Sequence, residues 1–378
     1  MRGIAMRRQA EHVKQKKVSH ILCIFISLCL VLISGSIGFF AGKYARLPET
    51  ISLMTYSNLQ NSSALKKIDN YGLYQLSYSG DYHLDDFLQK GAKSDYELLQ
   101  FAQTHLLNGQ KIDLSKMKIA CTSFVTKDGN GDIIYGRNMD WQSKLASVQV
   151  YTHPKNGYAS VSTAPLNLPG QAASTDTAAL MAKVAPYLPL DGMNEKGLTV
   201  SALYVPSSST PHDDAKTSVG SFTIMRLLLD KTQNVDEAIN LMRQYNLYFT
   251  SNVGLHYLIA DATGKSVIVE YYDHDMKVVY PEEGKDYQIA SNFIAYDGLN
   301  IGENNKDFEF DRYNTVQTTI EQHGGRLEEK DAVDLLAKVG IKKGDNDELQ
   351  WSVIYNLSKK TGEIFAHRNT NNITTFKL

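Results

Sequence analysis

The sequence predicts an α+β fold, and three observations support that prediction. The chain has 378 residues, of which 43% are hydrophobic and 21% are charged, so it can bury one large core or two modest ones. Segments typical of strands occur in runs and are followed by runs of helix-like segments, whereas a parallel sheet would show the two alternating. Two pairs of strand-like segments are separated by short polar turns, which predicts antiparallel hairpins.

The chain begins with a basic leader that is followed by an apolar segment. Residues 21–42 contain no charged side chain, and several Arg and Lys residues precede them. An apolar segment of this length can span a bilayer, and flanking cations usually stay on the cytoplasmic side. We therefore expect a cytoplasmic tail at 1–20, a single-pass membrane anchor at 21–42 and an extracytoplasmic body. A cleaved signal peptide, which would leave a secreted protein, is the alternative.

The charge is unevenly distributed along the chain. The formal net charge is −2 at pH 7, and the basic leader hides a body that is distinctly acidic. Phosphate binding requires cations clustered on the folded domain. The sequence therefore argues against nucleic acid as a partner.

Residues 43–120 are expected to form a stalk and a small folded segment. The stalk is expected at 47–68, where the composition is mixed and polar. A strand is expected at 71–78, and apolar residues at helical spacing predict a helix at 95–107.

The rest of the chain supplies most of the predicted elements. Residues 154–192 contain Pro and Gly with little periodicity, so surface loops are expected there. One helix should begin after Asn234, because Glu237 occupies the capping-box position, and another should end at Gly340. The predicted elements are a hairpin at 119–141, a strand at 197–205, helices at 222–229 and 235–245, strands at 255–260, 266–272 and 277–280, helices at 311–322 and 331–339, and a closing hairpin at 351–367.

Cys121 is the only cysteine outside the apolar segment. The chain has three cysteines, and Cys23 and Cys29 lie within residues 21–42. Cys121 therefore has no partner for an intrachain disulfide in the exported body. It is either a buried structural cysteine, which packs as a small hydrophobe, or a reactive thiol. The hairpin at 119–141 folds Cys121 back toward Arg137 and Asp140.

The turn of this hairpin resembles the start of a calcium-binding loop but fails two of its requirements. Asp128, Asn130 and Asp132 would supply oxygen ligands, whereas Ile133 and Met139 stand where Gly and Glu are required. We therefore expect a turn and no metal site.

Five short segments are spread over most of residues 121–378: CysThrSer at 121–123, GlyArgAsnMetAspTrp at 136–141, MetAsnGluLysGlyLeu at 193–198, LeuHisTyrLeuIleAlaAsp at 255–261 and SerValIleValGlu at 266–270. In this order they resemble the choloylglycine hydrolase family of linear amide hydrolases, which are N-terminal nucleophile hydrolases. The CysThrSer and GlyArgAsn strings are also similar to those of acid ceramidase and the N-acylethanolamine amidases. The resemblance implies a four-layer αββα sandwich as the catalytic domain, at 121–378.

The resemblance implies that Cys121 is the nucleophile, that Arg137 favours its thiolate and that Asp140 holds the α-amine. Chemistry gives an independent reason, because a thiol attacks only as the thiolate. Cleavage of the Ala120–Cys121 bond would free an α-amine with a pKa of about 8, which can act as the base. Without the resemblance, Arg137 and Asp140 would be interpreted as a structural ion pair.

Three further site residues follow from the resemblance. Asn292 matches the oxyanion-hole asparagine of the family, and Tyr204 occupies the partner position, where a backbone amide would donate. Arg312 matches a second arginine of the active site. The structural alternatives are a turn-capping amide for Asn292 and a solvated helix residue for Arg312.

No cofactor or metal is implied. His256 lies in an apolar strand-like segment and is expected to be a packed core residue without a chemical role. AspHisAsp at 273–275 reads as a polar turn between two strands, not as a metal site.

The residues that precede Cys121 depart from the pattern of many bacterial relatives, which begin essentially at the nucleophile. Processing here must be internal, as in ceramidase-like relatives. We expect the Cys121 thiol to attack the Ala120 carbonyl, after which residues 47–120 would stay bound as a small subunit.

The substrate is expected to be a small N-acyl amide. Tyr204 is the residue that penicillin V acylase-like members tend to have, whereas bile-salt hydrolases tend to have Asn; fatty N-acyl amides and acyl-homoserine lactones also suit a site near a membrane. Alternatives are bile-salt hydrolase or acyltransferase activity, a papain-like cysteine hydrolase that depends on His256 or His367, and a non-catalytic surface module. A homo-oligomer is compatible with the sequence.

Overall fold

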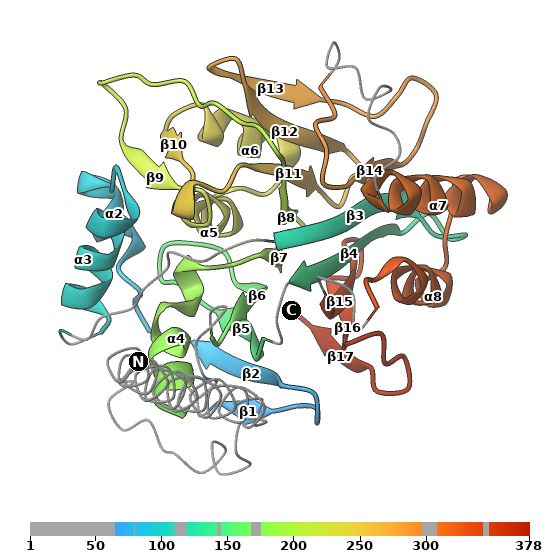
Figure 1. The fold of residues 1–378 in the computed structure, drawn as a ribbon, viewed down its shortest axis with the longest axis horizontal. Coiled ribbons are helices and arrows are strands. Elements are labelled where there is room, and N and C mark those ends of the chain that lie inside the picture. Colours follow the sequence, from blue (N-terminus) through green and yellow to red (C-terminus); the bar gives the residue numbers. More distant parts are fainter. Residues whose placement is uncertain are drawn as a thin grey trace, which may run out of the picture. The chain divides into compact units, whose positions relative to one another are not determined.

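Two β-sheets lie face to face at the centre of the fold (Figure 1). The computed structural model describes residues 65–78, 80–107, 109, 119–141, 145–167, 175–296, 308–342 and 348–378, all within the unit 47–378. The predicted tail at 1–20, the predicted anchor at 21–42 and most of the predicted stalk lie outside these residues. Within the described ranges, no helix combines the length and apolar character needed to cross a membrane.

The larger sheet has nine strands. In spatial order they are β1 (Lys66–Lys67), β2 (Leu73–Tyr78), β5 (Ser147–Thr152), β6 (Ser160–Pro165), β7 (Asp191–Asn194), β8 (Thr199–Tyr204), β11 (Leu255–Ala260), β12 (Ser266–Tyr272) and β13 (Asp275–Val279). All neighbouring pairs are antiparallel except β2 and β5, which are parallel.

The smaller sheet has six strands, all antiparallel, and it carries Cys121. In spatial order they are β14 (Gln288–Ala290), β3 (Ile119–Lys127), β4 (Ile133–Trp141), β15 (Glu348–Asn356), β16 (Thr361–Ala366) and β17 (Thr374–Lys377). A separate pair joins β9 (Ser218–Gly220) to β10 (Asn246–Tyr248) in parallel.

Helices cover the outer faces of both sheets. The helices are α2 (Leu84–Lys90), α3 (Asp95–His105), α4 (Thr175–Val184), α5 (Thr223–Lys231), α6 (Val235–Met242), α7 (Phe308–Gln322) and α8 (Glu329–Val339), with short 3-10 turns at Ala185–Tyr187 and Thr250–Asn252. In the larger sheet α5 packs on β7 and β8, and α6 packs on β11. In the smaller sheet α7 packs on β14 and β3, and α8 packs on β4 and β15. The α+β prediction is confirmed, and these contacts give the layer order helix, sheet, sheet, helix.

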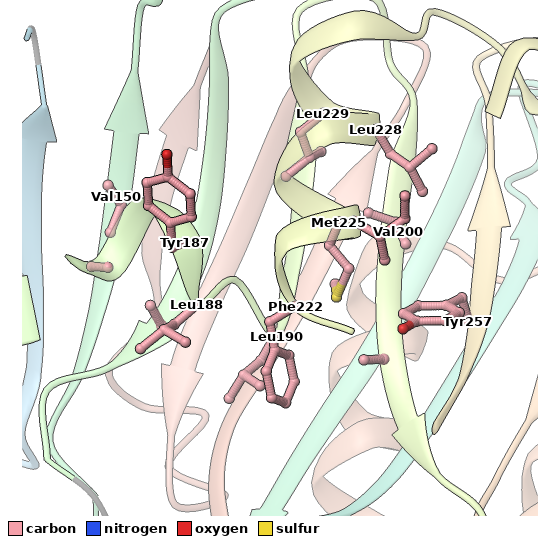
Figure 2. Close-up of a cluster of buried hydrophobic side chains, with 14 of the residues drawn as sticks. Val150, Tyr187, Leu188, Leu190, Val200, Phe222, Met225, Leu228, Leu229 and Tyr257 are labelled. Atoms are coloured by element: carbon pink, nitrogen blue, oxygen red, sulfur yellow. The ribbon is translucent and has the colours of Figure 1, made fainter. Parts of the chain in front are cut away.

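The core between the larger sheet and α5 is built from alternate residues of each strand. Tyr257 and Val200 point toward Met225 of α5 in Figure 2, and all three side chains are fully buried. Strand residues alternate between faces, so the neighbours of Tyr257 face the smaller sheet. Each fully buried aliphatic side chain of this kind stabilises the fold by about 1.5–3 kcal/mol.

The segment upstream of Cys121 is an integral part of the larger sheet. Strand β2 pairs with β5 from Leu73 opposite Ser147 to Tyr78 opposite Thr152. The Phe87 ring of α2 packs edge-on against Tyr187, with 5.7 Å between ring centroids. The predicted strand at 71–78 and helix at 95–107 are confirmed as β2 and α3.

The predicted strands and helices after residue 196 are confirmed, with small shifts at their ends. The Asn234 side chain accepts from the Glu237 amide at 2.9 Å, as a capping box requires. Helix α8 ends at Gly340. The predicted turn at 273–275 joins β12 to β13, and Asp273 and His274 both have positive φ there.

The expectation of surface loops at 154–192 is wrong. This region contains β6, α4 and β7, and every residue of both strands is buried. The alternation that identifies a half-buried strand is absent here because β6 carries small polar residues at buried positions. The Ser160 hydroxyl lies 2.6 Å from the buried Arg226 guanidinium. A strand covered on both faces need not alternate between apolar and polar residues.

Candidate active site

The β3–β4 hairpin places Cys121 in the interior, opposite Met139. Its turn is formed by Asp128, whose carboxylate accepts from the amides of Asn130 at 2.9 Å and Asp132 at 2.8 Å. Cys121 shares a face of β3 with Ser123, whose hydroxyl lies 3.0 Å from that of Ser201 in β8. The thiol therefore points from the smaller sheet toward the larger one.

Glycine is required at the start of the GlyArgAsn string. A Cβ atom at Gly136 would overlap the Phe124 ring of β3. The close approach of the two strands explains why this position carries no side chain.

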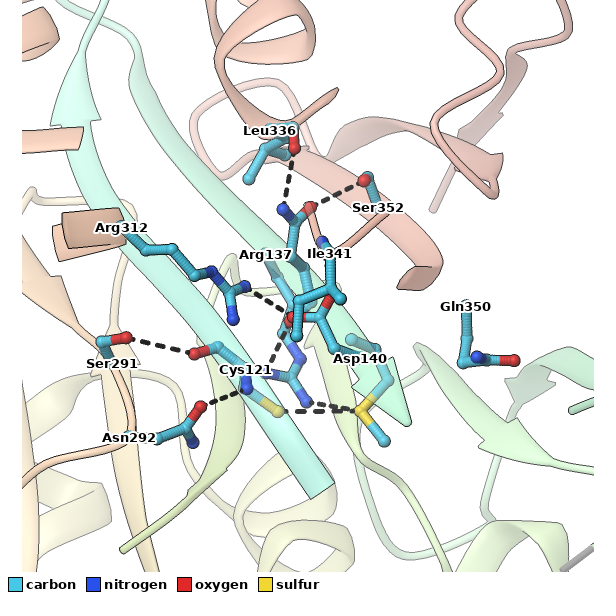
Figure 3. Close-up of polar contacts among 12 residues, drawn as sticks. Cys121, Arg137, Asp140, Ser291, Asn292, Arg312, Leu336, Ile341, Gln350 and Ser352 are labelled. Atoms are coloured by element: carbon cyan, nitrogen blue, oxygen red, sulfur yellow. Dashed lines mark hydrogen bonds and ion pairs between the residues drawn. The ribbon is translucent and has the colours of Figure 1, made fainter. Parts of the chain in front are cut away.

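The Cys121 thiol is fully buried beside a guanidinium group. Its exposed fraction is 0%, and Sγ lies 3.7 Å from Met139 Sδ. Arg137 Nη2 lies 3.3 Å from Met139 Sδ (Figure 3). Burial has the largest effect on the Cys121 thiol and raises its pKa to about 11. The positive charges of Arg137 and Arg312 lower this pKa, and the negative charge of Asp140 raises it. In the uncut chain this thiol is therefore protonated at neutral pH.

Asn292 joins the backbone of Cys121 to the larger sheet. The Cys121 amide donates to Asn292 Oδ1 at 2.6 Å, and Asn292 Nδ2 donates to the Tyr204 carbonyl at 2.9 Å. The Ser291 hydroxyl donates to the Cys121 carbonyl at 3.4 Å. The segment after β14 thus contacts both the amide and the carbonyl group of Cys121 (Figure 3).

Asp140 and Arg312 form a buried ion pair beside this cluster. Arg312 Nη2 lies 2.5 Å from Asp140 Oδ2, and the Ile341 amide donates to Oδ1 at 3.1 Å. Both side chains are nearly inaccessible, at 3% and 0% exposure. In the uncut chain, the hydrogen bond of the Cys121 nitrogen therefore goes to Asn292, while Asp140 links α7 to the segment after α8.

Tyr204 contributes its backbone, and its side chain is 36% exposed. The next amide, Val205 N–H, donates to the Gly254 carbonyl on the β11 side. Successive amides of a strand point to opposite sides, so the Tyr204 N–H points away from β11. It lies on the side where the Tyr204 carbonyl meets Asn292.

The structure brings together the six predicted site residues: Cys121, Arg137, Asp140, Tyr204, Asn292 and Arg312. It also shows two buried acids that the sequence analysis did not single out. Asp191 accepts from Arg137, and Glu270 accepts from the amides of Ala295 and Tyr296, each at 2.8 Å. Each is an acid within a buried strand, a pattern that suggests a paired charge.

The side chain of His256 is hydrogen-bonded to Glu270. Its Nδ1 atom lies 2.7 Å from Glu270 Oε1, and the ring is fully buried. Among the described residues, no three His, Cys, Asp or Glu side chains are grouped as a metal site would need.

These features define a class of fold and site: an αββα arrangement in which a buried cysteine and an arginine face the larger sheet, an asparagine holds the cysteine backbone, and an aspartate–arginine pair lies beside them under the helices of the smaller sheet. A family model described as linear amide C-N hydrolases, choloylglycine hydrolase family, matches residues 121–318. This match covers more than half of the chain, and the protein belongs to this family.

Individual relatives are more distant. Penicillin V acylase of Pectobacterium atrosepticum is 24% identical over 197 residues, which are 48% of this chain and 52% of that protein. Bile salt hydrolase/transferase of Clostridium perfringens is 25% identical over 195 residues, 47% of this chain and 58% of that protein. The matched region thus spans little more than half the length of these relatives.

Solved structures support the fold. Penicillin V acylase from Agrobacterium tumefaciens superposes with a TM-score of 0.52 and 19% identity, over 68% of this chain and 86% of that one. A variant of conjugated bile acid hydrolase from Clostridium perfringens gives a TM-score of 0.50 and 18% identity, over 68% of this chain and 92% of that one.

Proposed function

We propose that this protein hydrolyses linear amide bonds of N-acyl compounds with Cys121 as an N-terminal nucleophile. The observation that carries the proposal is the pairing of both functional ends of Cys121. Its nitrogen lies 2.6 Å from Asn292 Oδ1, and its thiol lies beside the Arg137 guanidinium. A site with these groups can hold an α-amine and a thiolate next to each other.

The first step of the proposal is self-cleavage. The Cys121 sulfur attacks the Ala120 carbonyl carbon, so a thioester bond forms while the peptide bond to Cys121 breaks. The thiol proton ends on the Cys121 nitrogen. Water then hydrolyses the thioester, which releases a carboxylate at Ala120 and restores the thiol. This step is needed because the uncut chain has no α-amine to accept the thiol proton.

After cleavage the α-amine acts as the general base. An α-amine has a pKa of about 8, so a neutral fraction is present at pH 7. Asn292 Oδ1 already accepts from this nitrogen and can keep it in place. Arg137 stabilises the thiolate by its charge, and Asp140 orients the amine as the second predicted partner. Arg312 acts through Asp140 and is a positioning residue.

The oxyanion of the tetrahedral intermediate is stabilised by two donors. One is the Tyr204 amide, and the other is a hydrogen of the Asn292 side chain, whose nitrogen lies 2.9 Å from the Tyr204 carbonyl. Removing one such donor typically lowers the rate on the order of a hundredfold or more.

The segment upstream of Cys121 stays bound after cleavage. Its β2 strand forms a full parallel pair with β5, and Tyr82 donates to the buried carboxylate of Asp230. Tyr187 donates in turn to the Tyr82 carbonyl at 2.8 Å. Residues 47–120 then form a small subunit, and residues 21–42 anchor it to a membrane with the catalytic body outside the cytoplasm.

The substrate class is small N-acyl amides. The relatives and neighbours carry the names of penicillin V acylase and bile salt hydrolase/transferase. Tyr204 favours the acylase-like substrates, as the resemblance implies.

The test is amine release by the full-length protein and its Cys121→Ala variant. The panel contains penicillin V, a glycine-conjugated bile acid, an N-acylethanolamine and an N-acyl-homoserine lactone. We expect at least one to be hydrolysed by the wild type and none by the variant. Amine release that does not depend on Cys121, or no release from any substrate of the panel, would contradict the proposal and favour a non-catalytic module.

A further inference from the structure

Asp191 is a fully buried carboxylate that accepts three hydrogen bonds from the smaller sheet. It begins β7 of the larger sheet, and its exposed fraction is 0%. Its Oδ2 atom lies 3.3 Å from Arg137 Nε and 2.9 Å from Trp351 Nε1, and its Oδ1 atom accepts from the Tyr355 hydroxyl at 2.7 Å. Every polar contact of this side chain therefore crosses the space between the two sheets.

The three donors lie on one face of two neighbouring strands. Trp351 and Tyr355 are four residues apart on β15, and Val353, between them, is paired with Arg137 of β4. Residues of like parity point to the same side of a sheet. The donors thus surround Asp191 from a single direction. The two β15 donors lie beyond residue 318, where the family match ends.

The contacts of Arg137 give its guanidinium a direction. Its Nε atom faces Asp191, while Nη2 faces the sulfur of Met139, which is itself 3.7 Å from Cys121 Sγ. One edge of the guanidinium is held by the carboxylate, and another therefore lies toward the thiol. The planar fork of arginine makes such an arrangement rigid when both edges are occupied.

We propose that Asp191, held in place by Trp351 and Tyr355, is a positioning residue that keeps the Arg137 guanidinium directed at the Cys121 thiol. The inference rests on the proposed role of Cys121 as the nucleophile. It gives the C-terminal β15 strand a part in the site, although none of its residues needs to touch substrate.

A competing explanation is that Asp191 only neutralises a buried arginine. The two explanations predict opposite signs. If Asp191 positions Arg137, its loss lets the guanidinium move, and the thiolate becomes harder to form. If Asp191 only neutralises Arg137, its loss leaves the full positive charge acting on the thiol, and the thiolate becomes easier to form. A purely structural role changes neither.

Charged and titratable groups from several elements face Cys121 and Asp191. Arg137 and Asp140 of β4 and Arg312 of α7 act on Cys121. Arg137 and Tyr135 of β4 and Tyr355 of β15 surround Asp191.

The experiment measures the pH at which Cys121 becomes reactive. Full-length wild type, Asp191→Asn and Tyr355→Phe are treated with iodoacetamide across a pH series, and labelling of the Cys121 peptide is quantified by mass spectrometry. Tyr257→Phe is the matched control, because its buried hydroxyl also bonds across elements, to the Ser221 carbonyl at 2.8 Å, but on the face of the larger sheet that packs on α5.

We expect the midpoint of labelling to rise by about one pH unit in Asp191→Asn and by less in Tyr355→Phe, with no shift in Tyr257→Phe. One unit corresponds to about a tenfold loss of thiolate at neutral pH. A midpoint that falls, or stays unchanged in both variants, overturns the proposal. If Asp191→Asn does not fold, Tyr355→Phe alone decides, because it removes one oxygen and keeps the ring.

This measurement is separate from the proposed hydrolysis. Labelling of Cys121 does not require turnover, so a shift is detectable even if no amide is hydrolysed. Wild-type protein that hydrolyses the panel but shows no shift in either variant rejects only the role of Asp191. Wild-type protein without hydrolysis rejects the proposed function.

Discussion

The Arg137→Gln variant tests how the thiol is activated. The change removes the positive charge that most strongly opposes burial in setting the pKa of Cys121. A hydrogen bond to a charged group is worth about 1.5–3 kcal/mol, and one pKa unit equals about 1.4 kcal/mol. The pKa of Cys121 should therefore rise by about one to two units, and the thiolate fraction at neutral pH should fall about 10- to 100-fold.

The same substitution also destabilises the fold, so it needs a matched control. Loss of Arg137 leaves Asp191 without its cation, and breaking a buried pair typically costs about 3–5 kcal/mol. Arg226 is equally buried, at 0% exposure, and its Nη2 atom lies 2.6 Å from Asp230 Oδ1. Arg226→Gln should lose a similar amount of stability while the surroundings of Cys121 stay intact.

The assay compares three properties in the two variants. Urea unfolding reports stability, iodoacetamide labelling reports the reactivity of Cys121, and the fraction of chains that begin at Cys121 reports self-cleavage. We expect both variants to lose stability and only Arg137→Gln to lose labelling and cleavage. Equal loss of reactivity in both variants, or normal labelling of Arg137→Gln, would refute the reasoning.

Three further outcomes are expected. Burial raises the pKa of Cys121 from 9.0 to about 11 in the uncut chain, so the contribution of the protonated thiol to stability is fully present below pH 9 and is lost as the pH rises toward 11. Urea unfolding of the uncut chain at pH 8 and 10.5 should show wild type losing about 2 kcal/mol relative to Cys121→Ser, and parallel curves would contradict this. Glu270→Gln weakens the carboxylate that accepts from the amides of Ala295 and Tyr296, which follow Asn292, so steady-state kinetics should show kcat reduced about tenfold with KM little changed; a change in KM alone would argue against it. Tyr82→Phe removes the donor to Asp230 and should weaken retention of the upstream segment by about 1–3 kcal/mol, seen as loss of that fragment during purification after cleavage; unchanged retention in dilute urea would count against the contact.

The elements with a clear period or cap could be predicted from the sequence. The capping box at Asn234, the stop at Gly340 and the β3–β4 hairpin all depend on local chemistry, and each is present in the structure. The loop prediction at 154–192 failed because β6 is covered on both faces and carries small polar residues at buried positions, where Ser160 meets the distant Arg226 side chain.

In the candidate site, too, residues that are close in the sequence could be predicted, and residues brought together only by folding could not. Arg137 and Asp140 could be placed near Cys121 because a hairpin connects them. Asn292 and Arg312 could be found only through the family resemblance, since they lie on other elements. Asp191 was missed, because its donors Arg137, Trp351 and Tyr355 come from two distant strands and only the packing of the sheets brings them together.

The parallel pairing of β2 with β5 also could not be predicted from the sequence. Composition identified a strand at 71–78, but nothing in it specified a partner across the position of Cys121. The pairing makes the upstream segment part of the larger sheet. Cleavage before Cys121 would therefore divide the chain without removing a separate domain.

The most direct test of the account is the N-terminus of the processed protein. Full-length wild type and Cys121→Ala are expressed in parallel, and each is analysed by intact mass and N-terminal sequencing. The account predicts a fragment that begins at Cys121, copurifying with the upstream segment, in wild type only. Active wild-type protein that remains uncut, or cleavage that persists in Cys121→Ala, would contradict the central claim that Cys121 frees its own α-amine.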